Sequence, residues 1–489
     1  MNYLRRTVIA LALALMLIAT PALTALAQDD GVGLGCNGLS DSDCTLLQDA
    51  TLATEALASY SIPAWTVNAY FSAEQETVFV EASGSATIAL PEEIVLLRDT
   101  FASVETVTPD TLHAFLLQLD ANSIQRMLDD LLVAFTVDQF ALAAPGEALT
   151  AYGAVLYKDR AFYLNLPAPS GENAWFSQPV TLTNADLDEI DEALAELRDA
   201  VLEPDIDEAF DAAGGMLVMQ QEINALMQRH LTTTRLADDT LDGQPAAVFS
   251  STFNAKDLLS DPDLATTFLA VLENFTAQDP EMEPIEINEA QLQLLLTAVN
   301  LLIPEGSLTV NQWVGLDDGY LQRITLDGTL NIDPSLLMPG EETAPEPVVF
   351  DLSGAFDLAD FNAVSPDDVA VPADYYPAEM LDEFLVGTPE QVEQVLAVGD
   401  AVPGSFSLDG STHIYALPLE AGQTVVLSLE SDHYPYLSVY NPDAFLVETH
   451  SIFGGEPLAF TADADGVHFV TVEGFSELDY TLTVIEAEG

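Results

Sequence analysis

The chain has 489 residues, of which 80 are Asp or Glu and only 11 are Lys or Arg, for a formal net charge of −69. A chain this acidic repels nucleic acid backbones and anionic lipid headgroups. We therefore expect neither a nucleic acid partner nor electrostatic docking on membranes. Because 49% of the residues are hydrophobic, the charge does not imply disorder, and a large core can be buried. We interpret the acids as a solvated, solubilising surface, with calcium binding as an open alternative.

The first 27 residues are expected to be a secretory signal peptide. Arg5 and Arg6 precede an unbroken apolar run from Val8 to Ala19, and Ala25-Leu26-Ala27 is a small-x-small cleavage signal. The run is too short for a transmembrane helix, and none is expected after signal cleavage. The mature protein is therefore expected to be extracellular, on the cell surface or periplasmic. A twin-arginine export route is the alternative.

The segment 28–49 contains the only two cysteines of the chain, Cys36 and Cys44. Outside the cytoplasm such a close pair is expected to form a disulfide. A lipid-modified Cys36 is disfavoured because Asp29 and Asp30 separate it from the apolar run. Metal binding is disfavoured because no histidine lies nearby, so no metal site is predicted.

From residue 50 to residue 380 the pattern alternates between strand-like and helix-like stretches. Alternating apolar residues predict strands at 65–71, 78–81 and 85–90, with Gly84 as a break. Apolar residues at steps of three and four predict helices at 112–119 and 124–135, and again from Thr183 to Val201. A hairpin is predicted at 152–166 around residues 158–160.

The second half of this stretch repeats the alternation. A hairpin is predicted at 232–253 around Asp242-Gly243, and Asp261 is placed to begin a helix. An apolar helix is predicted at 291–303, followed by a hairpin that joins 308–314 to 320–330 and by a strand at 348–358. Residues 381–398 are expected to be a linker.

The last part of the chain is strand-like throughout. Seven short strands are predicted, at 404–408, 413–417, 424–430, 437–440, 458–461, 467–472 and 480–484. Seven strands in so short a stretch are typical of a small β-sandwich.

This C-terminal part resembles the bacterial pre-peptidase C-terminal (PPC) domain. The resemblance is carried by Gly404-Ser-Phe406, His413-Ile-Tyr415, Ala421-Gly-Gln423, Asp465-Gly466 and Asp479-Tyr480-Thr-Leu482. It covers about 399–486 and implies an all-β, jelly-roll-like sandwich at 399–489. Domains of this family are accessory modules of secreted proteins without catalytic residues of their own.

The stretch 50–380 resembles the LolA/LppX-like lipoprotein-carrier fold. The resemblance is carried by Leu241-Asp-Gly-Gln-Pro-Ala-Ala-Val-Phe249, by the hairpin from Val310 to Arg323 and by Phe356-Asp-Leu-Ala-Asp-Phe361. Gly315 stands where the family commonly has Asp. The resemblance implies an α+β domain, an unclosed antiparallel β-barrel with a helical lid and insertions, and an apolar cavity that holds acyl chains.

The candidate ligand-lining residues lie on two apolar helical stripes and at one tryptophan: Met216, Met219, Ile223, Met227, Leu292, Leu295, Leu296, Val299 and Trp313. Flexible methionine side chains suit varied apolar ligands, whereas the alternative is that these stripes are ordinary core. Trp313 and Arg323 are expected to face each other across a hairpin, where cross-strand packing is the simpler interpretation.

The leading hypothesis is a non-enzymatic, secreted or cell-surface binding protein that holds a lipid or another apolar small molecule in a cavity. An interaction module with a solid core, which binds surface proteins or glycans, is the alternative, and a divergent secreted hydrolase is the third. The chain contains no zinc-protease, nucleophile-elbow, Ser-x-x-Lys or P-loop motif, so we predict no catalytic residues and no cofactor.

Overall fold

The computed structural model describes residues 36–73, 76–102, 109–144, 147–201, 226, 229–269, 288–333, 335, 346–406, 411–431, 433, 435–451, 457–474 and 478–487. By its internal contacts the chain divides into two compact units. Unit 1 comprises residues 1–148, 157–160 and 180–370, and unit 2 comprises residues 149–156, 161–179 and 371–489. The predicted signal peptide, residues 1–27, lies outside the described residues.

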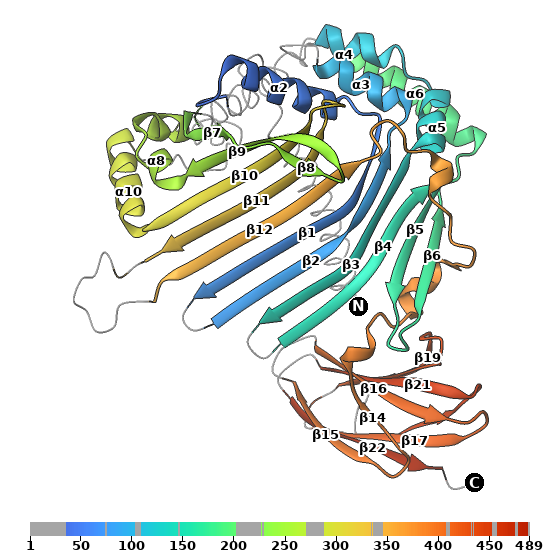
Figure 1. Ribbon diagram of the computed structural model, residues 1–489. Coiled ribbons are helices and arrows are strands. Elements are labelled where there is room, and N and C mark those ends of the chain that lie inside the picture. Colours follow the sequence, from blue (N-terminus) through green and yellow to red (C-terminus); the bar gives the residue numbers. More distant parts are fainter. Residues whose placement is uncertain are drawn as a thin grey trace. The chain divides into compact units, whose positions relative to one another are not determined.

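Unit 1 is built on a long antiparallel sheet with the strand order β3-β2-β1-β12-β11-β10-β9-β7, and β8 pairs with β9 (Figure 1). Its strands are β1 (Ser59–Ala73), β2 (Glu76–Ala89), β3 (Leu132–Ala144), β7 (Leu231–Arg235), β8 (Asp239–Leu241), β9 (Gln244–Asn254), β10 (Glu305–Gly315), β11 (Leu321–Ile332) and β12 (Val348–Ala359). The order brings β1 next to β12, although almost the whole unit separates them in sequence. Among the described residues no sheet is closed into a barrel.

The helices of unit 1 include several that begin next to a capping side chain. They are α2 (Asp41–Glu55), α3 (Glu92–Ala102), α4 (Pro109–Leu116), α5 (Ala121–Asp130), α6 (Asn184–Ala200), α8 (Ala255–Leu259) and α10 (Glu289–Leu302), with the short 3₁₀ helix η2 (Pro366–Asp368). Thr183 and Asn288 each form a capping box at the first turn of α6 and α10, which satisfies otherwise unpaired backbone N–H groups. No helix in the described ranges is long and apolar enough to span a membrane.

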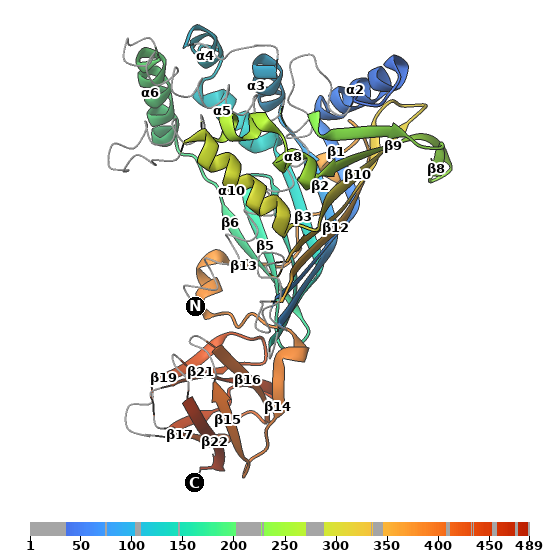
Figure 2. The ribbon, with the colours of Figure 1, turned by 90° about the vertical axis from the view of Figure 1, so that its left-hand side faces the viewer.

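Helices α2 to α6 gather at one end of the strands (Figure 1). Side-chain contacts hold the group together: Arg126 Nε of α5 lies 2.7 Å from Glu93 Oε1 of α3. The guanidinium of Arg198 on α6 donates to the backbone oxygen of Leu116 at 2.9 Å, so it caps the last turn of α4. Helices α8 and α10 lie at the edge of the sheet near β9 and β10 (Figures 1 and 2).

Unit 2 contains two further sheets and the strands β4 to β6. Its elements are β4 (Glu147–Lys158, of which 149–156 belong to unit 2), β5 (Ala161–Pro167), β6 (Asn173–Pro179), β13 (Tyr376–Pro377), η3 (Ala378–Glu383), η4 (Pro389–Gln391), β14 (Val392–Val395), β15 (Ala401–Phe406), β16 (Ser411–Leu419), β17 (Thr424–Ser431), β18 (Tyr436–Tyr440), β19 (Leu446–Ser451), β20 (Leu458–Thr461), β21 (Gly466–Gly474) and β22 (Leu478–Glu486). The sheets β14-β16-β21-β18-β19 and β15-β22-β17-β20 share one core of buried Leu, Val and aromatic side chains, as expected of a sandwich.

A second cluster of buried residues in unit 2 joins the β5–β6 hairpin to the C-terminal strands. Phe176 of β6 packs edge-on against Phe384, with ring centroids 5.0 Å apart, and Phe445 and Phe469 belong to the same cluster. Residues 381–398, expected to be a linker, contribute Phe384 and Leu385 to this buried cluster and also form β14.

Most predicted elements of this chain are confirmed, and several differ. Residues 132–135, predicted as the end of a helix, form the start of β3 because Leu132 and Phe135 pair with Ala89 and Ala86 of β2. Gly84 does not break a strand but lies inside β2, at a register shift against β3. Helices α2 and α3 and the strands β3, β6, β14 and β19 have no counterpart in the sequence prediction.

Candidate functional site

The antiparallel register of unit 1 gives its sheet two chemically different faces. Side chains of directly paired residues point to the same face, so each row of pairs can be followed across the sheet. One row runs through Trp65, Phe356, Ile324 and Gln312, and the next runs through Val67, Gly354, Leu326 and Val310. We call the face that carries these rows the apolar face.

Two more rows continue the apolar face toward the β1–β2 turn. Described residues of the four rows on β2, β1, β12, β11 and β10 are Gly84, Ala82, Val80, Val78, Trp65, Val67, Ala69, Phe71, Phe356, Gly354, Leu352, Phe350, Ile324, Leu326, Gly328, Leu330, Gln312, Val310, Leu308 and Gly306. Gln312 is the one polar side chain in this set. The apolar face therefore spans five neighbouring strands.

The opposite face of the same strands is polar. Its rows on β1, β12, β11 and β10 include Thr66, Asn68, Ser353, Asp351, Asp357, Arg323, Thr325, Asp327, Thr329, Asn311 and Thr309. Hydrogen bonds run between the strands, such as the 2.6 Å contact from Thr329 Oγ1 to Asp351 Oδ1. These side chains therefore suit the opposite face to contact with solvent.

Burial decreases along the apolar face from one end to the other. On β1 the exposed fraction rises from 4% at Trp65 to 42% at Phe71, and on β12 it rises from 6% at Leu358 to 39% at Phe350. Leu308 of β10 is 36% exposed at the same end. Complete burial of one such side chain contributes about 1.5–3 kcal/mol. A ligand that covers the exposed end of the apolar face would therefore gain binding free energy.

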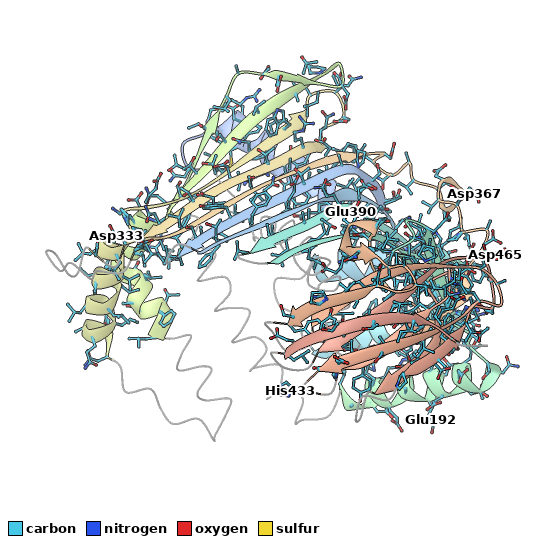
Figure 3. The ribbon with its side chains drawn as sticks, turned by 90° about the horizontal axis from the view of Figure 1, so that it is seen from below. Glu192, Asp333, Asp367, Glu390, His433 and Asp465 are labelled. Atoms are coloured by element: carbon cyan, nitrogen blue, oxygen red, sulfur yellow. A yellow bond between two sulfur atoms is a disulfide. The ribbon has the colours of Figure 1, made fainter. Side chains whose placement is uncertain are left out.

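Helix α2 covers part of the buried end. Leu47 and Ala50 of α2 form one buried cluster with Phe249, Ile324 and Leu358 of the sheet. At the strand end near Leu330, Gly306 of β10 lies so close to Ala255 of α8 and to Ile303 that an added Cβ would be 2.9 Å and 3.2 Å from their side chains. Asp333, next to α10 in Figure 3, donates its backbone N–H to the oxygen of Leu302 at 2.7 Å. The described helices thus flank the apolar face and leave Phe71, Phe350 and Leu308 partly exposed.

The buried end contains a polar atom without a partner. The indole of Trp65 stacks on Phe135, with ring centroids 5.4 Å apart and planes inclined by 13°. Its neighbours in the same cluster are Ile62, Ala82 and Ala86, and within the part of the chain that the structure describes its Nε1 has no hydrogen-bond partner. An unsatisfied buried donor of this kind costs about 1–3 kcal/mol, which makes Trp65 an exception to the usual pairing of buried polar groups.

The described arginines are all engaged by acceptors of the protein itself. Their partners are Asp99 for Arg98, Glu93 for Arg126, Asp129 for Arg160, the Leu116 oxygen for Arg198, Asp263 for Arg229, Asp238 for Arg235 and Asp357 for Arg323. Lys158 donates to the backbone oxygen of Val369 at 2.6 Å. An anionic ligand would therefore compete with these partners for the guanidinium groups and for Lys158.

The predicted lining residues are distributed over three places. Met216, Met219, Ile223 and Met227 lie outside the described residues. On α10, Leu292 is buried, Leu296 and Val299 are half-buried and Leu295 is 53% exposed. Leu294 and Leu301 of the same helix are also exposed, at 72% and 62%.

Trp313 is paired with Arg323 across the β10–β11 hairpin, as expected. Strand alternation places both side chains on the face opposite Gln312 and Ile324, hence on the polar face. The indole of Trp313 donates to Asp239 Oδ2 at 3.1 Å, and Arg323 forms an ion pair with Asp357. The pKa of Asp239 is held below its ordinary value, mainly by the backbone N–H of Thr240 and next by this indole.

The apolar face is the part of the candidate site that the sequence analysis missed. The alternation of Trp65, Val67, Ala69 and Phe71 in the sequence predicts a sheet with one covered face. The pairing with β12 adds Phe350, Leu352 and Phe356 to the same face, and no sequence pattern indicates that pairing.

The described residues contain no group of three or more His, Cys, Asp or Glu side chains arranged to hold a metal ion. The disulfide between Cys36 and Cys44 is present, with the two Cα atoms 5.1 Å apart. Its loop is tied to the sheet, since the backbone oxygen of Asn37 accepts from the N–H of Thr233 at 2.8 Å.

Among known proteins, the chain is similar to several solved structures. No protein family model and no curated protein matches the chain. The pre-peptidase C-terminal domain of a collagenase from Bacillus anthracis is 16% identical and covers 19% of this chain and 95% of its own, with a TM-score of 0.17. LprF from Mycobacterium bovis is 12% identical and covers 68% of this chain and 97% of its own, with a TM-score of 0.24.

The lipoprotein LppX from Mycobacterium tuberculosis is 10% identical and covers 68% of this chain and 100% of its own, with a TM-score of 0.20. Both resemblances expected from the sequence are therefore found among solved structures. At these identities and TM-scores, the similarity carries no argument about what this chain binds or does.

Proposed function

We propose that the protein is an exported, non-enzymatic carrier that holds the hydrocarbon part of a lipid on the apolar face of unit 1. The observation that carries the proposal is the contrast between the two faces of one sheet. At the end of the apolar face away from α2, Phe71, Phe350 and Leu308 are between 36% and 42% exposed. An exposed apolar surface rimmed by polar residues is typical of a binding site.

A hydrocarbon chain fits this surface better than a polar partner does. The rows are continuous from Trp65 to Phe71, and the strand rise of 3.3 Å per residue makes this path about 20 Å long. Each methylene group removed from water contributes about 0.8 kcal/mol, so a long acyl chain along the path gains considerable affinity. The exposed leucines of α10, including the predicted Leu295, would add to the apolar surface at the rim.

In this proposal unit 2 takes no part in lipid binding. Its PPC-like sandwich would act as an accessory module, and the predicted signal peptide would direct the protein to the extracellular space, the cell surface or the periplasm. Release of the lipid would require movement of the helices that flank the apolar face.

The test uses the purified full-length mature chain and the apolar fluorescent probe N-phenyl-1-naphthylamine. We expect saturable binding that Phe71→Gln and Phe350→Gln each weaken about ten-fold, the loss corresponding to about 1.4 kcal/mol of burial. Tyr70→Gln is the matched control, because Tyr70 is 36% exposed, adjacent to Phe71 in sequence and on the opposite face. Native mass spectrometry should also detect a co-purified lipid.

Absence of saturable probe binding by the wild-type chain, together with no co-purified lipid, would exclude the carrier function. Equal effects of the Phe71 and Tyr70 substitutions would place the bound probe elsewhere on the protein.

A further inference from the structure

The buried end of the apolar face carries one group that packing alone does not explain. Trp65 is 4% exposed, and its indole Nε1 has no hydrogen-bond partner among the described residues. The other two tryptophans, Trp175 and Trp313, are both less buried, and the indole N–H of Trp313 is bonded to Asp239. A phenylalanine would fill the place of Trp65 without burying a donor.

We propose that the indole N–H of Trp65 is the polar anchor of the carried lipid, donating a hydrogen bond to a neutral acyl carbonyl. This inference rests on the carrier function proposed above and adds the chemical class of the ligand. The ligand would be a long-chain ester or amide whose carbonyl oxygen lies at Trp65. Its hydrocarbon chain would follow Val67 and Ala69 to the exposed Phe71.

A water molecule is a poor alternative partner for this indole. A buried water is held by two to four polar groups, whereas among the described side chains of the cluster around Trp65 only Tyr60 carries a further polar group, and the others, such as Ile62 and Phe135, are apolar. A carbonyl oxygen needs only the one donor that Trp65 offers, and its attached chain continues into apolar surroundings.

The charge distribution favours a neutral head over a carboxylate. The formal net charge of −69 repels an anion, and the described arginines already serve acceptors within the protein. Arg98, whose N–H groups lie at the C-terminal end of α2, donates to the backbone oxygens of Leu57 and Ala56 and pairs with Asp99. A single neutral N–H donor suits an ester or amide carbonyl, which carries no charge to compensate.

The experiment compares two competitors of equal chain length on the full-length mature protein. A long-chain fatty acid methyl ester and the corresponding alkane each displace N-phenyl-1-naphthylamine from wild type, from Trp65→Phe and from Trp313→Phe. The wild type should prefer the ester roughly five-fold, as expected for one hydrogen bond. Trp65→Phe should remove this preference, so that the ratio of ester to alkane affinity falls to about one, whereas Trp313→Phe, the matched change on the polar face, should retain the preference.

A second measurement does not depend on a folded variant. In the wild-type chain labelled with ¹⁵N at its three indoles, the ester should shift the Trp65 N–H proton resonance downfield and the alkane should not. An ester preference that persists in Trp65→Phe, or no ester preference in the wild type, would overturn the anchor and leave the carrier function intact. Failure of the wild type to bind any probe would overturn both.

Discussion

The indole ring of Trp65 on β1 stacks on the phenyl ring of Phe135 on β3, although β2 lies between the two strands. The contact is possible because the residue of β2 paired with Trp65 is Gly84, which has no side chain. A Cβ at Gly84 would lie 1.8 Å from the backbone oxygen of Thr136 and 2.9 Å from Cζ2 of Trp65. The buried end of the apolar face therefore depends on one glycine.

Gly84→Ala should destabilise unit 1 by about 3 kcal/mol, because the backbone of β3 must move and the Trp65–Phe135 stack must open. Urea unfolding of the full-length chain measures the loss. Gly328→Ala is the control on the same face. There the nearest atom to an added Cβ is the flexible end of Leu308, at 3.2 Å, so a loss below about 1 kcal/mol is expected. Equal losses in the two variants would contradict the role assigned to Gly84.

Reduction of the Cys36–Cys44 disulfide should lower stability by about 2–3 kcal/mol through the entropy of the small loop it closes. The loop contains Ser40, the N-cap of α2, and it is hydrogen-bonded to β7 through Asn37 and Thr233. Hydrogen exchange should therefore become faster in α2 and β7 before it does in β1 and β2. The double variant Cys36→Ser/Cys44→Ser should show the same loss and no further response to reductant. Uniform acceleration over the sheet would argue against a local role.

Glu55, at the end of α2, should make the protein less stable as the pH rises. Burial raises the pKa of this carboxyl from 4.5 to about 7, against the opposing attraction of Arg98. The folded chain then holds the proton more tightly than the unfolded chain, so the contribution is full below about pH 4.5 and is lost as the pH rises through about 7. The side chain is only half-buried and water screens part of the effect, so we expect about 1 kcal/mol between pH 5 and pH 8.

Glu55→Gln is the test of this titration, because the amide keeps the shape of the side chain and does not ionise. The difference in melting temperature between wild type and Glu55→Gln should grow from pH 5 to pH 8, with the variant the more stable at pH 8. A difference that does not change with pH would show that Glu55 ionises as an ordinary surface carboxyl.

His468 should have the opposite pH dependence in unit 2. The imidazole is fully buried on β21, next to the ring of Phe460, and burial lowers its pKa below 6.5 against the weaker opposing effects of the Gly466 backbone and of Asp463. As the pH falls, the imidazole is protonated at a higher pH in the unfolded chain than in the folded chain. Stability is therefore lost as the pH falls below about 6.5. In His468→Phe the calorimetric transition of unit 2 should lose part of this acid sensitivity between pH 7 and pH 5. His433→Phe, at an exposed position, is the control, and equal behaviour of the two variants would refute the assignment.

The sequence by itself determined those features of the protein that depend on neighbouring residues. Asp242-Gly243 predicted a hairpin, and both residues have the positive φ angles that such a turn requires. Thr183 predicted the start of α6, and the close cysteines predicted their disulfide. The strands of the C-terminal part followed from alternation and turn residues. In each case the interaction that decides the conformation spans a few positions of the chain.

Tertiary structure decided those features that depend on the pairing of strands far apart in the sequence. Leu132 and Phe135 continue a helical pattern in the sequence, but hydrogen bonding to β2 makes them strand. Phe71 and Phe350 lie side by side in one row only because β1 pairs with β12, and the two faces of the sheet exist only once that register is set. The lack of a partner for the N–H of Trp65 among the described residues is likewise a property of the assembled cluster. Local patterns specify which residues are apolar, whereas long-range register decides which of them share a face and how far that face is covered.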